Sequence, residues 1–182
     1  VLDQTKHTLV CAFFDHEEVG SESHIGAAGS FLSDTLQRIS LALALDREDS
    51  ARALANSFLI SADMAHAYHP NFPNAYDANH KVFVNQGPVI KSNANRRYSS
   101  ESISIAQFIH WCQTANVPYQ HYSHRNDLAC GSTIGPLASA KLGIRSIDIG
   151  CPMWAMHSIR ESAGVHDHIY LIKVFKQFFL DT

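Results

Sequence analysis

The chain has 182 residues, of which 46% are hydrophobic and 17% charged, a composition typical of a globular protein with a sizeable core. Its formal net charge of -3 gives no basic footprint for nucleic acid, and no apolar run is long enough for a membrane span or a signal peptide. The four cysteines form no CxxC pair, which argues against a cysteine-built zinc site and favours reduced thiols in a cytoplasmic protein.

The first apolar run, residues 8–14 (TLVCAFF), predicts a strand that ends in front of the polar DHEE. Glu17 and Glu18 in this motif are adjacent carboxylates, which repel each other unless a cation or a proton shares the site. Residues 25–45 carry apolar side chains at helical spacing and predict a long helix, and residues 51–55 predict a short one.

The rest of the chain alternates strand-like and helix-like segments. Strands are predicted at residues 57–62, 88–91, 117–122 and 145–149, and helices at residues 100–115, 131–142 and 167–180. Residues 64–86 have no regular period, and loops of this length are usually functional or disordered; the aromatic residues argue against disorder. The alternation predicts a single α/β domain over residues 1–182, with helices on both faces of a layered sheet.

Polar residues follow three of the predicted strands. Glu17 and Glu18 follow the first strand, and Asp63 follows the second. His157 lies in the loop after the strand over residues 145–149. Because such sheets place their chemistry at the carboxyl ends of strands, we expect these side chains at one edge. Carboxylates and imidazole are zinc ligands, and a second carboxylate can take a proton from water. On an extended backbone the two glutamates would diverge, so that one binds metal and the other faces substrate.

Each of these signals also has an ordinary interpretation. Adjacent glutamates are usually a solvated turn, an aspartate after a strand is often a helix N-cap, and a lone histidine is usually a satisfied polar residue. Residues 130–135 (CGSTIG) could bind an anion at a helix N-terminus, but the P-loop, GxSxG and HExxH patterns are absent. Lys91, near another strand end, is either a solvated charge or the group that fixes an acidic substrate.

Five stretches together resemble motifs of the M18 family of metallopeptidases, the aspartyl aminopeptidases. They are DHEEVGSES, SADMAHAYHPN, GPVIKSNANRRYSS, RNDLACGSTIGP and MHSIRES, in the family's order and over almost the whole chain. The resemblance implies a three-layer α/β/α sandwich with a mostly parallel mixed sheet, as in the phosphorylase-like zinc aminopeptidases. It further implies a two-zinc hydrolase that removes N-terminal Asp or Glu from peptides and assembles as a homo-oligomer.

The resemblance also implies roles for individual residues. Glu17 matches the general base, and Glu18 matches the adjacent metal ligand. Asp63 matches a ligand of the other zinc, and His157 matches the histidine that shares a zinc with Glu18.

Two further residues match substrate-binding positions of the family. Lys91 matches the basic residue that meets the acidic side chain of the substrate, and Tyr98 matches a tyrosine that stabilises substrate or intermediate. We expect His16 at most to contact the metal ligands without binding metal itself. His66 and His69 lie in a family motif but are assigned no role.

Enzymes of this family are longer than this chain, which resembles the C-terminal portion of their catalytic domain. A further histidine, a bridging aspartate and the dimerisation domain are expected upstream, so the chain offers three of the five expected ligands. The alternative hypothesis is a non-catalytic fragment or scaffold subunit that lacks a complete metal site. A third is a related two-metal peptidase with a different side-chain preference.

Overall fold

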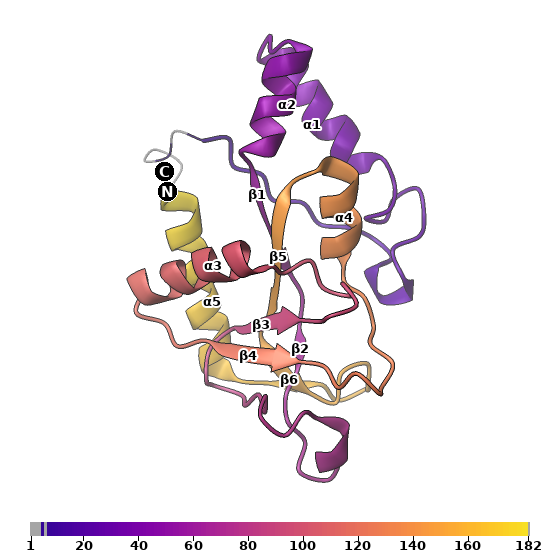
Figure 1. Ribbon diagram of the computed structural model, residues 1–182, viewed down its shortest axis with the longest axis vertical. Helices are drawn as coiled ribbons and strands as arrows, with labels where there is room; N and C mark the ends of the chain where they lie inside the picture. Colours follow the sequence, from indigo (N-terminus) through magenta and orange to yellow (C-terminus); the bar gives the residue numbers. More distant parts are fainter. Residues whose placement is uncertain (1–4, 6, 182) are drawn as a thin grey trace.

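A computed structural model describes residue 5 and residues 7–181 of the chain (Figure 1). Its main sheet has four strands in the order β1-β5-β3-β4. They are β1 (Phe58–Ala62), β3 (Val89–Ser92), β4 (Gln120–Ser123) and β5 (Arg145–Gly150). The pairs β1–β5 and β3–β4 are parallel, and β3 runs antiparallel to β5. The sheet is therefore mixed and mostly parallel, as predicted.

Helices cover both faces of this sheet (Figure 1). They are α3 (Ser102–Thr114) and α5 (Val165–Leu180) on one face and α4 (Ile134–Leu142) on the other. The helices α1 (Phe31–Ala42) and α2 (Arg47–Ala55) lie beyond the end of the sheet, at the top of Figure 1. Ile147 and Ile149 of β5 pack in the core formed with α3 and α5, whereas Asp148 between them faces α4. The alternation along β5 thus separates α4 from α3 and α5, which confirms the α/β/α layering.

The main core lies between the sheet and the α3–α5 layer. It is built from large apolar side chains of both helices and of β3 and β5, including Ile90, Phe108, Trp111, Ile147 and Val174. Trp111 also packs edge-on against Phe58 of β1, with ring centroids 5.1 Å apart. This packing holds the strands in register, so the ends of β1 and β3 are fixed relative to each other.

A second, small sheet is formed by segments that were expected to be irregular, namely residues 64–86 and the loop after residues 145–149. It consists of β2 (Ala65–His66), β6 (Pro152–Trp154) and β7 (Ser162–Ala163), in the order β2-β6-β7. Strands of two or three residues are too short to show an alternating pattern in sequence. The sheet was therefore not predicted, although it anchors the two segments that carry Asp63 and His157.

The predicted strand over residues 8–14 is wrong. These residues form no strand, and the Phe13 side chain is 87% exposed. A strand needs a hydrogen-bonding neighbour, and none pairs with this segment among the described residues. Glu17–Val19 likewise form a short 3-10 helix, η2, and not the extended backbone that we expected.

Several predicted helix boundaries also shift. The expected helix over residues 25–45 is shorter, because residues 25–30 form turns and bends before α1. α2 begins earlier than expected, since Asp46 caps it by accepting a hydrogen bond from the Asp49 N–H at 2.8 Å. α4 starts at Ile134 and ends at Gly143, whose φ of 68° closes the helix as predicted. Among the described residues, no helix has the length and apolar character needed to cross a membrane.

Candidate active site

The six residues singled out from the sequence line one cleft of about 360 Å³. They are Glu17, Glu18, Asp63, Lys91, Tyr98 and His157. The segments that carry them are far apart in the sequence and meet where β1, β3 and the small sheet end. The tertiary structure therefore brings the predicted residues together, including those whose local structure was predicted wrongly.

Glu17 and Glu18 reach the cleft from the 3-10 helix η2. The helix ends at Gly20, whose φ of 103° lets its N–H bond to the Glu17 carbonyl at 3.0 Å. In a 3-10 helix, successive side chains point about 120° apart, because there are about three residues per turn. The two carboxylates therefore diverge, as expected, but through a tight turn and not through an extended strand.

Glu18 forms an ion pair with His157. Oε2 of Glu18 lies 2.8 Å from Nε2 of His157, and both side chains are exposed. His157 has a positive φ of 68°, and its backbone N–H donates to Oε1 of Glu161 at 2.6 Å. Glu161 therefore helps to hold the strained turn that presents the imidazole. A carboxylate and an imidazole side by side are a donor pair that zinc accepts.

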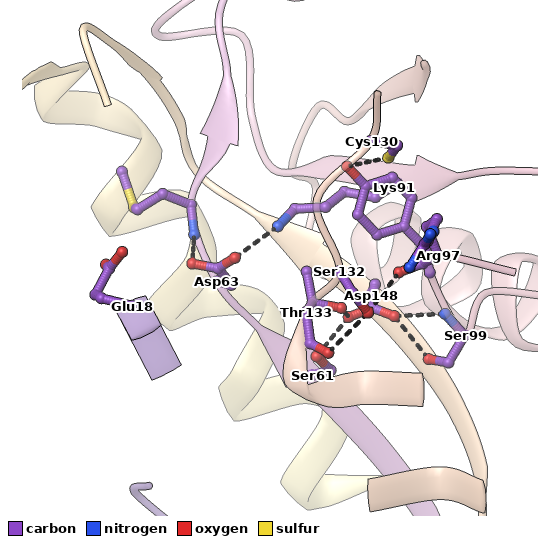
Figure 2. Close-up of polar contacts among 12 residues, drawn as sticks. Glu18, Ser61, Asp63, Lys91, Arg97, Ser99, Cys130, Ser132, Thr133 and Asp148 are labelled. Carbon is purple, nitrogen blue, oxygen red and sulfur yellow. Dashed lines mark hydrogen bonds and ion pairs between the residues drawn. The ribbon is translucent and has the colours of Figure 1, made fainter. Parts of the chain in front are cut away.

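Asp63 is bound by donors of this chain on both oxygens. Oδ1 accepts the Met64 N–H at 2.6 Å, and Oδ2 lies 3.2 Å from Nζ of Lys91 (Figure 2). The Lys91 side chain is only 3% exposed, and its Nζ also lies 5.7 Å from the centre of the Tyr98 ring. Asp63 and the aromatic ring thus offset the cost of burying this ammonium group.

Glu17 is the carboxylate whose protonation equilibrium is shifted. Partial burial raises its pKa, and the negative charges of Asp63 and Glu18 raise it further. Lys91 and His157 oppose this shift. The direction of the shift makes Glu17 a better proton acceptor than an ordinary solvated glutamate.

The donor set fits zinc only in part. Glu18 and His157 form a ready pair, whereas Asp63 is engaged by Lys91 and by the backbone. Within the described part of the chain, no group of three or more His, Cys, Asp or Glu residues is close enough to hold a metal ion. A catalytic zinc takes three protein ligands, so the Glu18–His157 pair needs at least one further ligand to hold a zinc ion.

Tyr98 lies buried in the wall of the cleft. Burial raises the pKa of its hydroxyl well above the ordinary value, and the neighbouring Cys130 raises it further. The Cys130 thiol donates to the Tyr98 oxygen at 3.6 Å. The phenol therefore stays protonated, and its own hydrogen remains free to be donated into the cleft.

Other lining residues were not assigned from the sequence. Besides Glu161 they include His66, Tyr122 and His124. His124 Nε2 donates to the Ala129 carbonyl at 3.0 Å, so Nδ1 accepts the Tyr122 hydroxyl at 2.7 Å. The one sequence signal that could have identified His124 as a cleft residue is its position after the strand predicted at residues 117–122. His16 bonds to Ser23, the His69 ring packs at a tilt against Phe72, and neither histidine lines the cleft.

Comparisons with known proteins agree on one family. Residues 1–179 match the family described as aminopeptidase I zinc metalloprotease (M18). A probable M18 family aminopeptidase 2 from Pseudomonas paraeruginosa is 49% identical over 175 residues, which cover 96% of this chain and 39% of that protein. A chain in the solved complex of Ape4 and Nbr1 is 46% identical with a TM-score of 0.87, over 92% of this chain and 32% of that chain.

A solved dodecamer of mApe1 from S. cerevisiae is also similar, at 30% identity and a TM-score of 0.80 over 92% of this chain and 37% of that chain. The chain thus spans well under half the length of the relatives it matches. The α/β fold, the sequence motifs and the family match are mutually consistent. The chain therefore belongs to the M18 family of aminopeptidase I zinc metalloproteases.

Proposed function

We propose that the intact protein is a two-zinc aminopeptidase that removes Asp or Glu from the N-termini of peptides. The observation that carries this proposal is the convergence of three features on one cleft. These are the Glu18–His157 pair, the neighbouring Glu17 carboxylate and the buried Lys91 ammonium. Together they combine metal donors, a proton acceptor and a fixed positive charge for an acidic side chain.

In this proposal Glu18 and His157 hold one zinc and Asp63 contributes to the second. The remaining ligands come from outside the described residues, which fits the absence there of a complete donor group. When bound, zinc would act as a Lewis acid on water and on the scissile carbonyl. Asp63 is already held by the Met64 N–H, so its carboxylate is oriented before any metal arrives.

Glu17 acts as the general base. Its carboxylate accepts a proton from the attacking water and later gives it to the leaving amine. Because η2 turns Glu17 away from Glu18, one carboxylate can carry the proton while the other binds metal.

Lys91 and Tyr98 bind the substrate. The Lys91 ammonium is buried and fixed, so it can receive the carboxylate of an N-terminal Asp or Glu in a charge-assisted hydrogen bond. Tyr98 keeps its hydroxyl hydrogen, which it can donate to a substrate oxygen. We also propose a homo-oligomer, supported by the dodecameric state of the similar mApe1 structure.

The rival function is a scaffold subunit without catalysis. The incomplete donor group among the described residues favours it for this chain considered by itself. A related peptidase with another side-chain preference is the third hypothesis, and it differs from the first only in the role of Lys91.

The test compares Glu17→Gln and Glu18→Gln in the full-length protein. We measure zinc by elemental analysis and hydrolysis of a peptide with N-terminal Asp. Glu17→Gln should lose turnover and keep its zinc, whereas Glu18→Gln should lose zinc as well. Loss of zinc with unchanged turnover in Glu17→Gln would refute the general-base role. A wild-type protein with neither zinc nor hydrolysis would refute the aminopeptidase function and leave the scaffold hypothesis.

A further inference from the structure

A second carboxylate, Asp148, is completely buried behind the cleft. It lies in β5, and its residue has 0% exposed surface. Oδ1 accepts the hydroxyls of Ser61 and Thr133, each at 2.5 Å. Oδ2 accepts both the backbone N–H and the hydroxyl of Ser99, at 2.5 Å and 2.8 Å (Figure 2). Both carboxylate oxygens are thus saturated by donors.

Within the described part of the chain, this carboxylate has no cationic partner. None of the ion pairs found among the described residues includes Asp148. Burying a carboxylate without a cation costs free energy, which only hydrogen bonds offset here. An apolar side chain would fill the same volume without that cost, so packing alone does not explain an aspartate at this position.

Each residue that donates a hydrogen bond to Asp148 belongs to a segment that forms part of the cleft. Ser61 lies in β1 two residues before Asp63, and Ser99 directly follows Tyr98. Thr133 itself lines the cleft, next to Gly131 and Ser132. The Ser132 hydroxyl also lies 3.4 Å from the Arg97 carbonyl, which joins two of these segments directly.

The first turn of α4 packs directly against the same carboxylate. A Cβ atom added to Gly135 would lie 2.4 Å and 2.5 Å from the two oxygens of Asp148. A side chain at this position would push the carboxylate away from its donors. The close approach of Gly135 therefore belongs to the same arrangement, and it fixes how near α4 lies to β5.

Tyr98 has little else to fix its hydroxyl. Its hydroxyl oxygen accepts a hydrogen bond from the Cys130 thiol at 3.6 Å, and a thiol is a weak donor. The two bonds from Ser99 to Asp148 are shorter and charge-assisted. The Tyr98 ring packs among Ala65, Val82, Val89 and Tyr122, and the bonds from Ser99 to Asp148 hold the backbone that carries this ring.

We propose that Asp148 is a positioning residue that fixes Tyr98 and the wall at residues 131–133 relative to Asp63. It touches neither substrate nor metal and acts through Ser99, Thr133 and Ser61. The catalytic consequence of this role rests on the proposed aminopeptidase function, whereas the placement of Tyr98 against Cys130 does not. The two can therefore be tested separately.

The test replaces Asp148 by Asn in the full-length protein. An amide keeps the size of the side chain but replaces one acceptor oxygen by a donor, so it cannot accept on both sides. The matched control is Asp167→Asn, because Asp167 is equally buried and accepts the backbone N–H groups of Asn85 and Gly87. Both variants perturb a buried carboxylate, but only Asp148 is connected to Tyr98.

The first measurement is the rate at which an alkylating reagent modifies Cys130. Mass spectrometry follows the tryptic peptide over residues 126–141, which contains no other cysteine. Asp148→Asn should speed the modification about 10-fold, as expected for the loss of one charge-assisted hydrogen bond, whereas Asp167→Asn should not. An unchanged rate in Asp148→Asn, or an equal increase in both variants, would overturn the proposal.

The second measurement compares kcat and KM. Misplacing Tyr98 should lower kcat by about 10- to 100-fold in Asp148→Asn, with little change in Asp167→Asn. Should Asp148→Asn fail to fold, Ser99→Ala replaces it, and Ser99→Thr should restore the wild-type values because it keeps the hydroxyl. If Ser99→Ala matches wild type in both measurements, the proposal is refuted. If the wild type has no peptidase activity, the proposed function fails while the Cys130 measurement still decides the role of Asp148.

Discussion

Lys91→Met gives the sharpest test of substrate selection, because the substitution keeps the apolar length of the side chain and removes only the charge. The Lys91 side chain is 3% exposed and its ammonium lies 3.2 Å from Asp63. Solvent therefore screens this charge little. A substrate carboxylate bound to it gains a hydrogen bond that is charge-assisted on both sides.

The expected size of the effect follows from that bond. Hydrogen bonds to charged groups contribute about 1.5 to 3 kcal/mol, which corresponds to about 10- to 150-fold in kcat/KM at about 1.4 kcal/mol per factor of ten. Lys91→Met should lower kcat/KM by this factor for a peptide with N-terminal Asp. For the isosteric peptide with N-terminal Asn the loss should be much smaller, since its amide carries no charge.

The ratio of the two substrates separates selection from structural damage. Removing the ammonium also leaves Asp63 with only the Met64 N–H, and that perturbation affects both peptides alike. The assay is steady-state kinetics of both peptides with wild-type and variant full-length enzyme at matched zinc content. An equal loss for Asp and Asn peptides would show that Lys91 only holds Asp63, and the acidic specificity would then be refuted.

Two further predictions concern the stability of the fold. A Cβ on Gly150 would lie 1.8 Å from the Asp63 carbonyl oxygen, so Gly150→Ala should lower the free energy of unfolding by about 1 to 3 kcal/mol. If the urea concentration at the midpoint of unfolding is the same for Gly150→Ala and wild type, this prediction is wrong. Burial raises the pKa of the Cys112 thiol from 9.0 to about 12, so above pH 9 the unfolded thiol ionises while the folded one does not. Stability should then fall as pH rises from 9 to 12, by up to about 1.4 kcal/mol per pH unit, and urea unfolding of Cys112→Ala should show a shallower fall. If stability falls equally steeply with pH in wild type and Cys112→Ala, ionisation of Cys112 is not the cause.

Long periodic elements were predictable from the sequence. The strand before Asp63 and the helices α3 and α5 were predicted to within a few residues, because each buries an apolar face whose spacing is visible in sequence. Residues 8–14 show the limit of this approach. Their composition favours a strand, but a strand exists only where a neighbour completes its hydrogen bonds, and composition does not report the neighbour.

Six residues of the cleft were predicted, but only part of their mutual contacts. The resemblance already assigned Glu18 and His157 to one zinc, whereas the contact between Asp63 and Lys91 is a tertiary result. Only the structure placed an ammonium against an expected metal ligand. It also added Glu161, since a side chain that holds a backbone turn leaves no periodic signal.

The sequence by itself determined the α/β class, the family resemblance and the residue types that the site needs, because these depend on local spacing and on motifs. The tertiary structure alone showed that Lys91 meets Asp63 and that Asp148 binds three separate segments behind the cleft. The physical reason is that hydrogen bonds and ion pairs form between atoms a few ångströms apart in space. Ser61 and Asp148 are 87 residues apart in the chain, a separation that no local pattern encodes.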